Sequence, residues 1–403
     1  MVEYDFSTMP DRRGHDAIAV DLQENDFWKL PQGETRPGFD KIPMWIADMN
    51  FSTAPCVTEA IVQRAVHPIY GYFVPSDEYY DAIIRWQKES FGVTDLTRQN
   101  IGYENGVLGG VTSALQVLNP AHAPVLVHSP TYTGFTTQLE RNGFPVALSP
   151  LRADENGVLR MDIDDMERQI KEQHIHTALF CSPHNPSGRV WQRWELEQAM
   201  ELYQKYNVNV ISDEIWSDLT LFGSRHIPTQ TISEDAKQRT VAFYAPSKTF
   251  NLAGLVGSYH VVYNQKLADE LRVYEAKCHY NDMNVLAMHA LIGAYTPEGR
   301  AWMEQLKRVL ETNIELTIDF FQNEVQGVSL RKPEGTYIVV PDFENWCKSH
   351  DRTLDELLRS GVEVGVLWRD GRQFHIPYGI RLALGLPTKK LEEALRRLKD
   401  YVL

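Results

Sequence analysis

Four short apolar runs, separated by helical stretches, constrain the fold of this chain more than any other feature. Each run is long enough for one buried strand. The runs cover residues 124–128, 177–181, 208–212 and 240–244. A helical pattern lies between two of them, over 194–203. Strands that alternate with helices predict βαβ units, and therefore an α/β fold with a mostly parallel sheet flanked by helices.

The pattern changes after about residue 290, which predicts a second, smaller α+β domain. Pro297 begins a long amphipathic helical pattern, and strand-like segments follow at 336–340 and 380–384. A length of 403 residues agrees with two domains. We therefore expect an N-terminal arm at 1–45 that packs with the small domain, a large domain at 46–290 and a small domain at 291–403.

Composition narrows the classes of partner. The 40 Lys and Arg residues against 54 Asp and Glu give a net charge of −14. Because nucleic acids and anionic membranes attract clustered positive charge, we expect neither as a main partner. The four cysteines lie far apart without CxxC spacing, so we expect no metal site and no disulfide framework. No signal peptide or membrane-spanning window is evident, which favours the cytoplasm.

Three polar side chains, Asn185, Asp213 and Lys248, each follow the end of a predicted strand. Ligands of parallel sheets bind beyond the carboxyl ends of the strands, so we expect these side chains to lie together. An amine, a buried carboxylate and a carboxamide are what pyridoxal 5'-phosphate (PLP) requires. The amine forms a Schiff base, the carboxylate keeps the pyridine nitrogen protonated, and the amide binds the ring phenol oxygen. The combination predicts an enzyme of amino-acid chemistry.

Each of these residues has a plainer interpretation when it is taken alone. The prolines and glycine of 182–188 favour an ordinary Asn-Pro turn. Asp213 and Glu214 also fit an exposed acidic pair that caps a helix, although a charge directly after a buried strand needs a cationic partner. Lys248 also fits a solvated lysine, whereas burial would disfavour its charged form and make it a usable base.

Further segments are candidates for ligand contacts. The glycine-rich segment 105–111 predicts a phosphate cradle at a loop-to-helix junction, although it does not match GxGxxG and a tight helix cap is an equal alternative. Tyr132 is a candidate to stack on a cofactor ring, or a core tyrosine. Arg381 is a candidate to bind a substrate carboxylate, or an arginine at a strand edge.

Taken together, these motifs resemble those of fold-type I PLP-dependent enzymes of the class I/II aminotransferase superfamily. More narrowly, they resemble the branch of cystathionine β-lyase-like C–S lyases. The resemblance implies a PLP-dependent transferase fold and extends over nearly the whole chain. The motifs that carry it are Met-Trp-Ile-Ala-Asp-Met (44–49), Ser-Pro-His-Asn-Pro-Ser-Gly-Arg-Val-Trp (182–191), Asp-Glu-Ile (213–215), Ser-Lys-Thr-Phe-Asn-Leu-Ala-Gly-Leu (247–255), Pro-Glu-Gly-Thr-Tyr (333–337) and Ile-Arg-Leu (380–382).

The resemblance implies roles for matched residues at the cofactor and the substrate. It makes Lys248 the Schiff-base lysine, Asp213 the partner of the ring nitrogen, and Asn185 the partner of the ring oxygen. Arg381 becomes the carboxylate clamp. The other residues implied at the cofactor are Tyr132 on the ring and the Val107 and Leu108 amides with Ser247 at the phosphate, and those implied at the substrate are Ala47 and Trp216.

One implied residue concerns assembly. Tyr72 resembles a tyrosine that a neighbouring subunit gives to the cofactor phosphate. That implies an obligate homodimer with shared active sites.

Several positions depart from the family pattern. Trp216 stands where aminotransferases commonly have Tyr and the lyase branch usually has His, and an indole donates one hydrogen bond and cannot titrate. Ala245 replaces a serine and Val256 an arginine near the phosphate, Asn50 replaces an aspartate, and 16–21 departs as well. These changes leave the cofactor prediction intact and bear on the substrate.

We therefore expect a PLP-dependent C–S lyase that performs β-elimination on cystathionine or a related sulfur amino acid. Its products would be a thiol, pyruvate and ammonia. The alternatives are an aminotransferase acting on an L-amino acid and, in a different class, a regulatory binding protein with the PLP fold.

Overall fold

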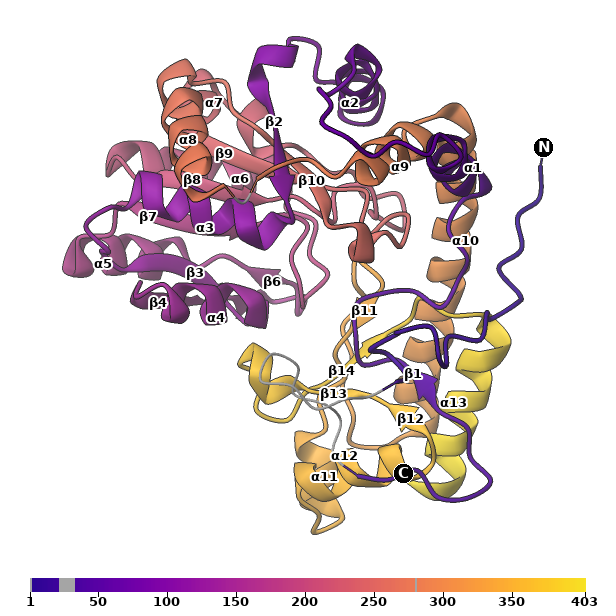
Figure 1. Ribbon diagram of the computed structural model, residues 1–403. Coiled ribbons are helices and arrows are strands. Elements are labelled where there is room, and N and C mark those ends of the chain that lie inside the picture. The colour runs from indigo at the N-terminus through magenta and orange to yellow at the C-terminus, as the bar shows by residue number, and fades with distance from the viewer. Residues whose placement is uncertain (1, 22–32, 280) are drawn as a thin grey trace. The chain divides into compact units, whose positions relative to one another are not determined.

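The computed structural model describes residues 2–21, 33–279 and 281–403. They divide into two compact units, whose elements are labelled in Figure 1. Unit 1 comprises Met1–Ser52, Pro186–Gly188 and Glu304–Leu403, and unit 2 comprises Thr53–Asn185 and Arg189–Met303. The domain boundaries expected near residues 45 and 290 stay a prediction, and part of the expected N-terminal arm (1 and 22–32) lies outside the described residues.

A seven-stranded sheet forms the centre of unit 2, in the order β2-β10-β9-β8-β7-β3-β4. β10 is antiparallel to both neighbours and the other pairs are parallel. This confirms the predicted α/β class, and the four apolar runs form β3, β7, β8 and β9. The strands are β2 (Ile101–Asn105), β3 (Val125–Ser129), β4 (Val146–Pro150), β7 (Thr177–Cys181), β8 (Asn209–Asp213), β9 (Thr240–Tyr244) and β10 (Gly257–Val261), with a separate hairpin of β5 (Arg152–Ala153) and β6 (Leu159–Arg160).

Two apolar cores cover the two faces of this sheet. Alternate side chains of each strand enter opposite cores: Val125 and Val127 pack in one, and Leu126 packs in the other. Residues of α3, α4 and α8 complete the first core, and residues of α5, α6 and α7 complete the second. The helices of unit 2 are α1 (Pro55–Ala65), α2 (Asp77–Phe91), α3 (Val107–Leu118), α4 (Thr133–Arg141), α5 (Ile163–Gln173), α6 (Arg193–Lys205), α7 (Glu234–Arg239), α8 (Gln265–Cys278) and α9 (Val285–Ala294), with short 3-10 turns η1 (Arg98–Asn100), η2 (Thr229–Thr231) and η3 (Ala253–Leu255).

Unit 1 contains a three-stranded antiparallel sheet, β11-β14-β13, and a parallel pair, β1 with β12. The helix predicted to begin at Pro297 is α10, which starts in unit 2 and continues into unit 1. The elements are β1 (Ile42–Pro43), α10 (Pro297–Asp319), the π-helical turn η4 (Phe320–Glu324), β11 (Ile338–Val339), α11 (Glu344–Ser349), α12 (Leu354–Glu363), β12 (Val366–Leu367), β13 (Arg369–Asp370), η5 (Gly371–Phe374), β14 (Ile380–Ala383) and α13 (Thr388–Tyr401).

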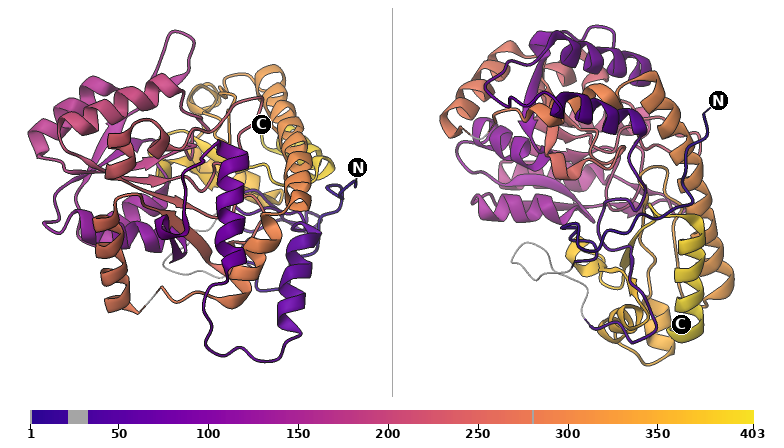
Figure 2. Two further views of the ribbon diagram at one scale, coloured as in Figure 1. Left: turned by 90° about the horizontal axis from the view of Figure 1, so that it is seen from above. Right: turned by 45° about the vertical axis from the view of Figure 1, so that its right-hand side comes forward.

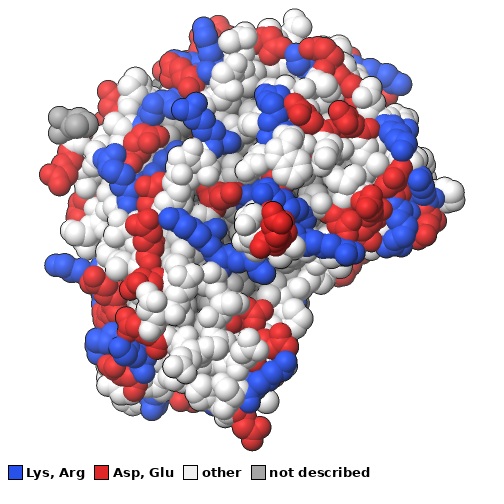
Figure 3. All heavy atoms as spheres, turned by 180° about the vertical axis from the view of Figure 1, so that it is seen from behind, with Lys and Arg blue, Asp and Glu red and all other residues white. Residues whose placement is uncertain are grey.

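Two surface features bear on the partners of the chain. The loop that joins α1 to α2 projects from the helices on either side of it (Figure 2, left). On the face drawn in Figure 3, basic and acidic side chains are interspersed. Among the helices that the structure describes, none combines the length and apolarity needed to cross a bilayer.

Candidate active site

The carboxyl ends of parallel strands in unit 2 bring the three predicted polar residues to one edge of the sheet. Cys181 at the end of β7 pairs with Asp213 at the end of β8, and Asp213 pairs with Phe243 in β9. Asn185 and Lys248 follow β7 and β9 within a few residues. β2 runs in the same direction, because β10 is antiparallel to both β2 and β9. The first turn of α3 therefore begins at this edge too.

Asp213 is a buried carboxyl group, 5% exposed, at the centre of this edge. Burial raises the pKa of Asp213 from 3.8 to about 7, although a backbone hydrogen bond and the nearby Lys248 act to lower it. The backbone bond comes from Ile215 N to Asp213 Oδ1 at 3.0 Å. A second cation at this position would stabilise the carboxylate further, as a protonated pyridine ring does.

Glu214, the other half of the predicted acidic pair, belongs to a separate buried network. His226 Nε2 lies 2.6 Å from Glu214 Oε2, and Tyr244 Oη donates to the same oxygen at 2.7 Å. Ser212 Oγ and Thr229 N donate to Glu214 Oε1 at 2.9 and 3.0 Å. Burial acts to raise the pKa of Glu214, but these partners outweigh it and hold that pKa below its ordinary value. Glu214 is therefore structural, and Asp213 is the carboxyl group available to a ligand.

Lys248 lies in the turn that follows β9, with its Nζ 5.8 Å from the centre of the Trp216 ring. Trp216 is 2% exposed. An indole face attracts an ammonium group electrostatically and shields it from water. The two residues that the sequence places near the reacting amine, Asp213 and Trp216, are thus both near Lys248 in unit 2.

A buried aspartate that sequence reasoning missed supports the lysine turn. Asp218 accepts hydrogen bonds from Trp86 Nε1 at 2.9 Å and from Thr249 Oγ1 at 3.1 Å. Thr53 Oγ1 also donates to the Phe250 carbonyl oxygen at 2.7 Å. These bonds tie both residues after Lys248 to the chain near α1 and α2. The sequence pattern that could have revealed Asp218 is its position directly before the mostly apolar segment 219–222, because a charged side chain beside buried residues needs hydrogen-bond partners.

Asn185 and Tyr132 flank this edge on the β7 and β3 side. Asn185 is 4% exposed, and its Oδ1 is buried without a hydrogen-bond partner among the described residues. Such an atom is typical of a site that a ligand completes. Tyr132 caps α4 and packs edge-on against Phe135. A Cβ atom on Gly134 would lie 2.4 Å from Tyr132 Cε1, so the ring position requires glycine there.

The predicted phosphate cradle is the N-terminus of α3. Gly106 precedes the helix at φ 84°, a backbone conformation that favours glycine. The first amides of α3, including those of Val107 and Leu108, are in the turn whose N–H groups lack acceptors within the helix. Val256, also at positive φ (58°), lies next to Gly106, since its Cγ1 would be 3.3 Å from a Cβ there. A β-branched residue in this conformation marks a strained site. Ser247 lies in the turn after β9.

The predicted carboxylate clamp lies in unit 1. Arg381, on β14, is 2% exposed, and its Nη2 donates to the Trp45 carbonyl oxygen at 2.8 Å. Its guanidinium also lies 4.6 Å from the centre of the Phe374 ring. Tyr337 Oη donates to the Ala47 carbonyl oxygen at 3.0 Å, and Arg381 acts electrostatically on the same tyrosine, so Tyr337 connects two of the predicted substrate residues, Ala47 and Arg381.

The Asn50 departure has a local explanation in unit 1. Asn50 Nδ2 donates to the Pro43 carbonyl oxygen at 3.0 Å, and Asn50 Oδ1 accepts from Arg12 at 3.2 Å. A carboxamide serves both bonds, whereas an aspartate would supply no donor. Arg12 also pairs with Asp48 at 2.5 Å.

Comparison with known proteins decides the family. The profile described as aminotransferase class I and II matches residues 40–398. The chain belongs to this family. It is 31% identical over 363 residues to cystathionine beta-lyase PatB of Bacillus subtilis (strain 168), which covers 89% of this chain and 92% of PatB. It is 28% identical to Protein MalY of Escherichia coli (strain K12) over 99% of each chain.

A solved structure agrees with the sequence relatives. The PLP-bound C-S lyase from Staphylococcus hominis matches 100% of this chain and 99% of its own, with a TM-score of 0.89 and 27% identity. The predictions of a fold-type I aminotransferase-family fold and of PLP as the cofactor are confirmed. The strand-end residues of unit 2 fit this cofactor, because the buried Asp213 needs a cation and the buried Asn185 Oδ1 needs a partner.

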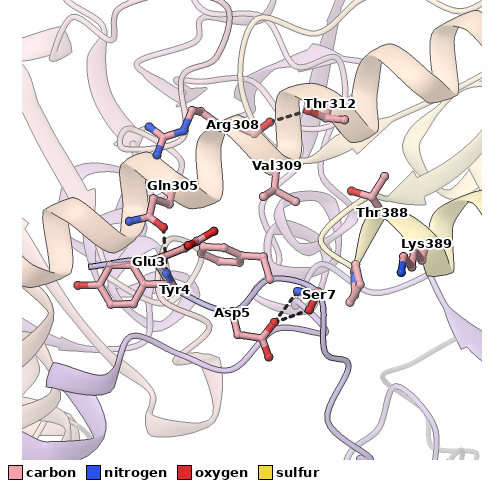
Figure 4. A pocket seen from close by; sticks show the side chains of 12 residues that line it. Glu3, Tyr4, Asp5, Ser7, Gln305, Arg308, Val309, Thr312, Thr388 and Lys389 are labelled. Atoms are coloured by element: carbon pink, nitrogen blue, oxygen red, sulfur yellow. Dashed lines mark hydrogen bonds between the residues drawn. The ribbon is translucent and has the colours of Figure 1, made fainter. Parts of the chain in front are cut away.

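A cavity in unit 1 involves other residues. It measures about 780 Å³ and lies among the N-terminal segment, α10 and the start of α13 (Figure 4). Tyr4 N donates to Gln305 Oε1 at 3.0 Å, and Asp5 Oδ1 accepts from both Ser7 N and Ser7 Oγ. The residues that line it include none of those predicted for the cofactor or the substrate.

The two neighbouring carboxyl groups should respond oppositely to pH in the cofactor-free protein. Between pH 3.8 and about 7 the unfolded chain ionises Asp213 while the folded protein keeps its proton. Stability therefore falls as the pH rises through this window, by at most about 4 kcal/mol. Asp213→Asn does not titrate, so we expect it to melt above the wild type at pH 8 and close to it at pH 4.

Glu214→Gln is the matched control. Because the folded pKa of Glu214 is lowered, its contribution is present at neutral pH and lost in acid, so this variant should melt below the wild type at pH 8. Thermal unfolding at both pH values measures the effect. An Asp213→Asn variant that melts below the wild type at pH 8 would contradict the assignment of Asp213 as the carboxyl group left for the cofactor.

Proposed function

We propose that this protein is a PLP-dependent C–S lyase that acts on cystathionine or a related sulfur amino acid by β-elimination. The observation that carries the proposal is the similarity to cystathionine beta-lyase PatB over 89% of the chain. The lysine, aspartate and asparagine at one strand edge of unit 2 support it. When bound, PLP supplies an electron sink that stabilises negative charge at the substrate Cα.

The residues that would hold the cofactor lie at or just after the ends of five strands of unit 2, β2, β3, β7, β8 and β9. Lys248 would attach it covalently, Asp213 would pair with its ring nitrogen, and Asn185 would bind its ring oxygen. The amides of Val107 and Leu108 with Ser247 would bind its phosphate, because helix N-termini bind anions. Tyr132 would stack on its ring.

Lys248 also acts on the substrate, together with Arg381 and Ala47. Arg381 binds the α-carboxylate, since a guanidinium grips a carboxylate through two bonds, and Ala47 lies in the same set of contacts. Lys248 is the base that takes the proton from Cα. The sulfur then leaves Cβ with the electron pair of the C–S bond and becomes the thiol on protonation. With one water consumed, the remaining carbon and nitrogen leave as pyruvate and ammonia.

We expect the PLP-loaded protein to release pyruvate and free thiol from L-cystathionine in equal amounts, with no keto acid added. Lys248→Ala should lower this release by at least 10³-fold, because it removes the base and the covalent anchor. A colorimetric thiol assay with a coupled pyruvate assay measures both products. Conversion of the cofactor to its pyridoxamine form without release would instead indicate an aminotransferase, and PLP binding with no turnover of any amino acid would favour a regulatory binding protein.

We further propose that the protein works as a homodimer in the cytoplasm. The loop between α1 and α2 exposes an apolar segment, and a subunit interface would cover it. Its exposed large apolar side chains are Val66, Ile69, Tyr70, Tyr72, Phe73 and Val74. All four cysteines are free thiols, as a reducing compartment favours.

Tyr72 and Tyr70 offer a matched test of the shared site. Tyr72 is fully exposed, whereas Tyr70 Oη donates to the Ala65 carbonyl oxygen in the same loop. If Tyr72 reaches a partner's phosphate, Tyr72→Phe removes a hydrogen bond to a charged group and should weaken PLP binding about 10-fold or more. Tyr70→Phe should change it less than twofold. PLP titration with sedimentation analysis measures both, and a monomeric wild type would sink the proposal.

A further inference from the structure

A buried group of acid and base side chains lies directly behind the α3 N-terminus. Glu104 is the second-last residue of β2, His260 belongs to β10, and Glu275 belongs to α8. His260 Nδ1 lies 2.6 Å from Glu104 Oε1 and 4.0 Å from Glu275 Oε1. The side chains are 0%, 8% and 12% exposed. Two carboxyl groups and one imidazole thus share one nearly dry space.

Asn281 connects this group to the predicted phosphate loop. Its Nδ2 donates to Glu104 Oε2 at 3.2 Å and to the Tyr103 carbonyl oxygen at 2.6 Å. Its Oδ1 accepts from Asn105 N at 2.7 Å. Asn105 immediately precedes Gly106, the cap of α3. One amide side chain therefore joins the buried carboxyl group to the residue at which the loop begins.

The charge balance of the group requires a proton. Burial and the neighbouring Glu104 raise the pKa of Glu275 to about 8, while Asn281 and Arg272 lower it. The charged and titratable groups near the two carboxyls are His260 from β10, Arg272 from α8, Tyr103 from β2 and Tyr79 from α2. The ligand atoms of Glu104, His260 and Glu275 all lie within 4.8 Å of one another, so a protonated Glu275 is placed to share its proton with Glu104. Above pH 8 it ionises, and two negative charges then face each other.

We propose that Glu275 is a positioning residue for the cofactor phosphate, acting through a proton shared with Glu104 and through Asn281 on the loop that begins at Asn105. The proposal rests on the proposed role of the α3 N-terminus in phosphate binding. While it keeps its proton, Glu275 adds no negative charge of its own behind a loop that binds a dianion. When Glu275 loses this proton, its negative charge repels the Glu104 carboxylate and the cofactor phosphate. The displaced Glu104 then holds Asn281 less firmly.

The test compares PLP with pyridoxal, which lacks the phosphate, from pH 7 to pH 9.5. Holoenzyme is transferred into amine-free buffers, and the fraction of cofactor that stays bound is followed by its absorbance, without substrate. The same protein loaded with pyridoxal serves as the reference, because pyridoxal is bound through Lys248 in the same way but has no phosphate. Its pH dependence therefore reports the effects of pH on the Lys248 linkage alone. The ratio of PLP to pyridoxal affinity then isolates the phosphate contribution.

In the wild type we expect this ratio to fall about 10-fold between pH 7 and pH 9.5, because ionised Glu275 adds one negative charge near the phosphate loop. Glu275→Gln stays neutral and keeps a donor for Glu104, so its ratio should change less than twofold. Glu270→Gln, on the exposed face of the same helix, is the control and should behave as the wild type. Asn281→Ala should lower the ratio at every pH, since it breaks the connection without altering the charge.

Three results would overturn the proposal in distinguishable ways. A ratio near one in the wild type at every pH would refute phosphate binding by this loop, and with it that part of the proposed function. A large ratio with the same pH profile in the wild type and Glu275→Gln would refute the role of Glu275 alone. Stoichiometric Zn²⁺ that is retained by the purified wild type and lost in Glu275→Gln would show that a metal ion, not a proton, joins the carboxyl groups.

Discussion

The strand-end edge of unit 2 depends on the carboxylate of Glu214. Its two oxygens accept from groups on β8, on β9 and on the chain at and before η2. A buried carboxylate without such partners would cost several kcal/mol, so the four bonds hold these segments in one arrangement. The bond from Glu214 N to the Phe243 carbonyl oxygen continues the ladder between β8 and β9. Side chains alternate along such a backbone, which turns Asp213 away from this network.

The sequence predicted those parts of the site that depend on local patterns. Apolar runs located β7, β8 and β9, and the rule for parallel sheets placed Asn185, Asp213 and Lys248 at one edge. The family resemblance assigned the ring nitrogen to Asp213 and not to Glu214. No local pattern predicted the network that holds Glu214, because its partner His226 lies 12 residues away in a segment without a regular pattern. The link from Arg381 to Trp45 spans 336 residues, and no local pattern reports a contact of that kind.

Trp216 is a departure from the family pattern that lies next to Lys248 in the fold. The indole is buried against Lys248, where the wider superfamily commonly has a phenol and the lyase branch usually an imidazole. Hydrogen bonds from Trp86 to Asp218 and from Ser212 to Glu214 hold the chain on either side of it. An indole does not titrate, so this position contributes no proton near Asp213, whose pKa burial raises. If Trp216 contacts the substrate as predicted, substrate shape is the property that this position would alter.

The buried acids of unit 2 follow one physical constraint: a charge removed from water needs a partner. Glu214 has His226, and Glu104 has His260. Glu275 lies farther from His260, at 4.0 Å, and neither Arg272 nor Asn281 outweighs burial and Glu104, so its pKa is raised. Asp213 differs from all three, because Lys248 offsets its burial only in part. The cofactor would supply the missing cation at the ring nitrogen, so binding it would remove a cost that the fold itself carries. Cofactor affinity and folding stability are then coupled through a single carboxyl group.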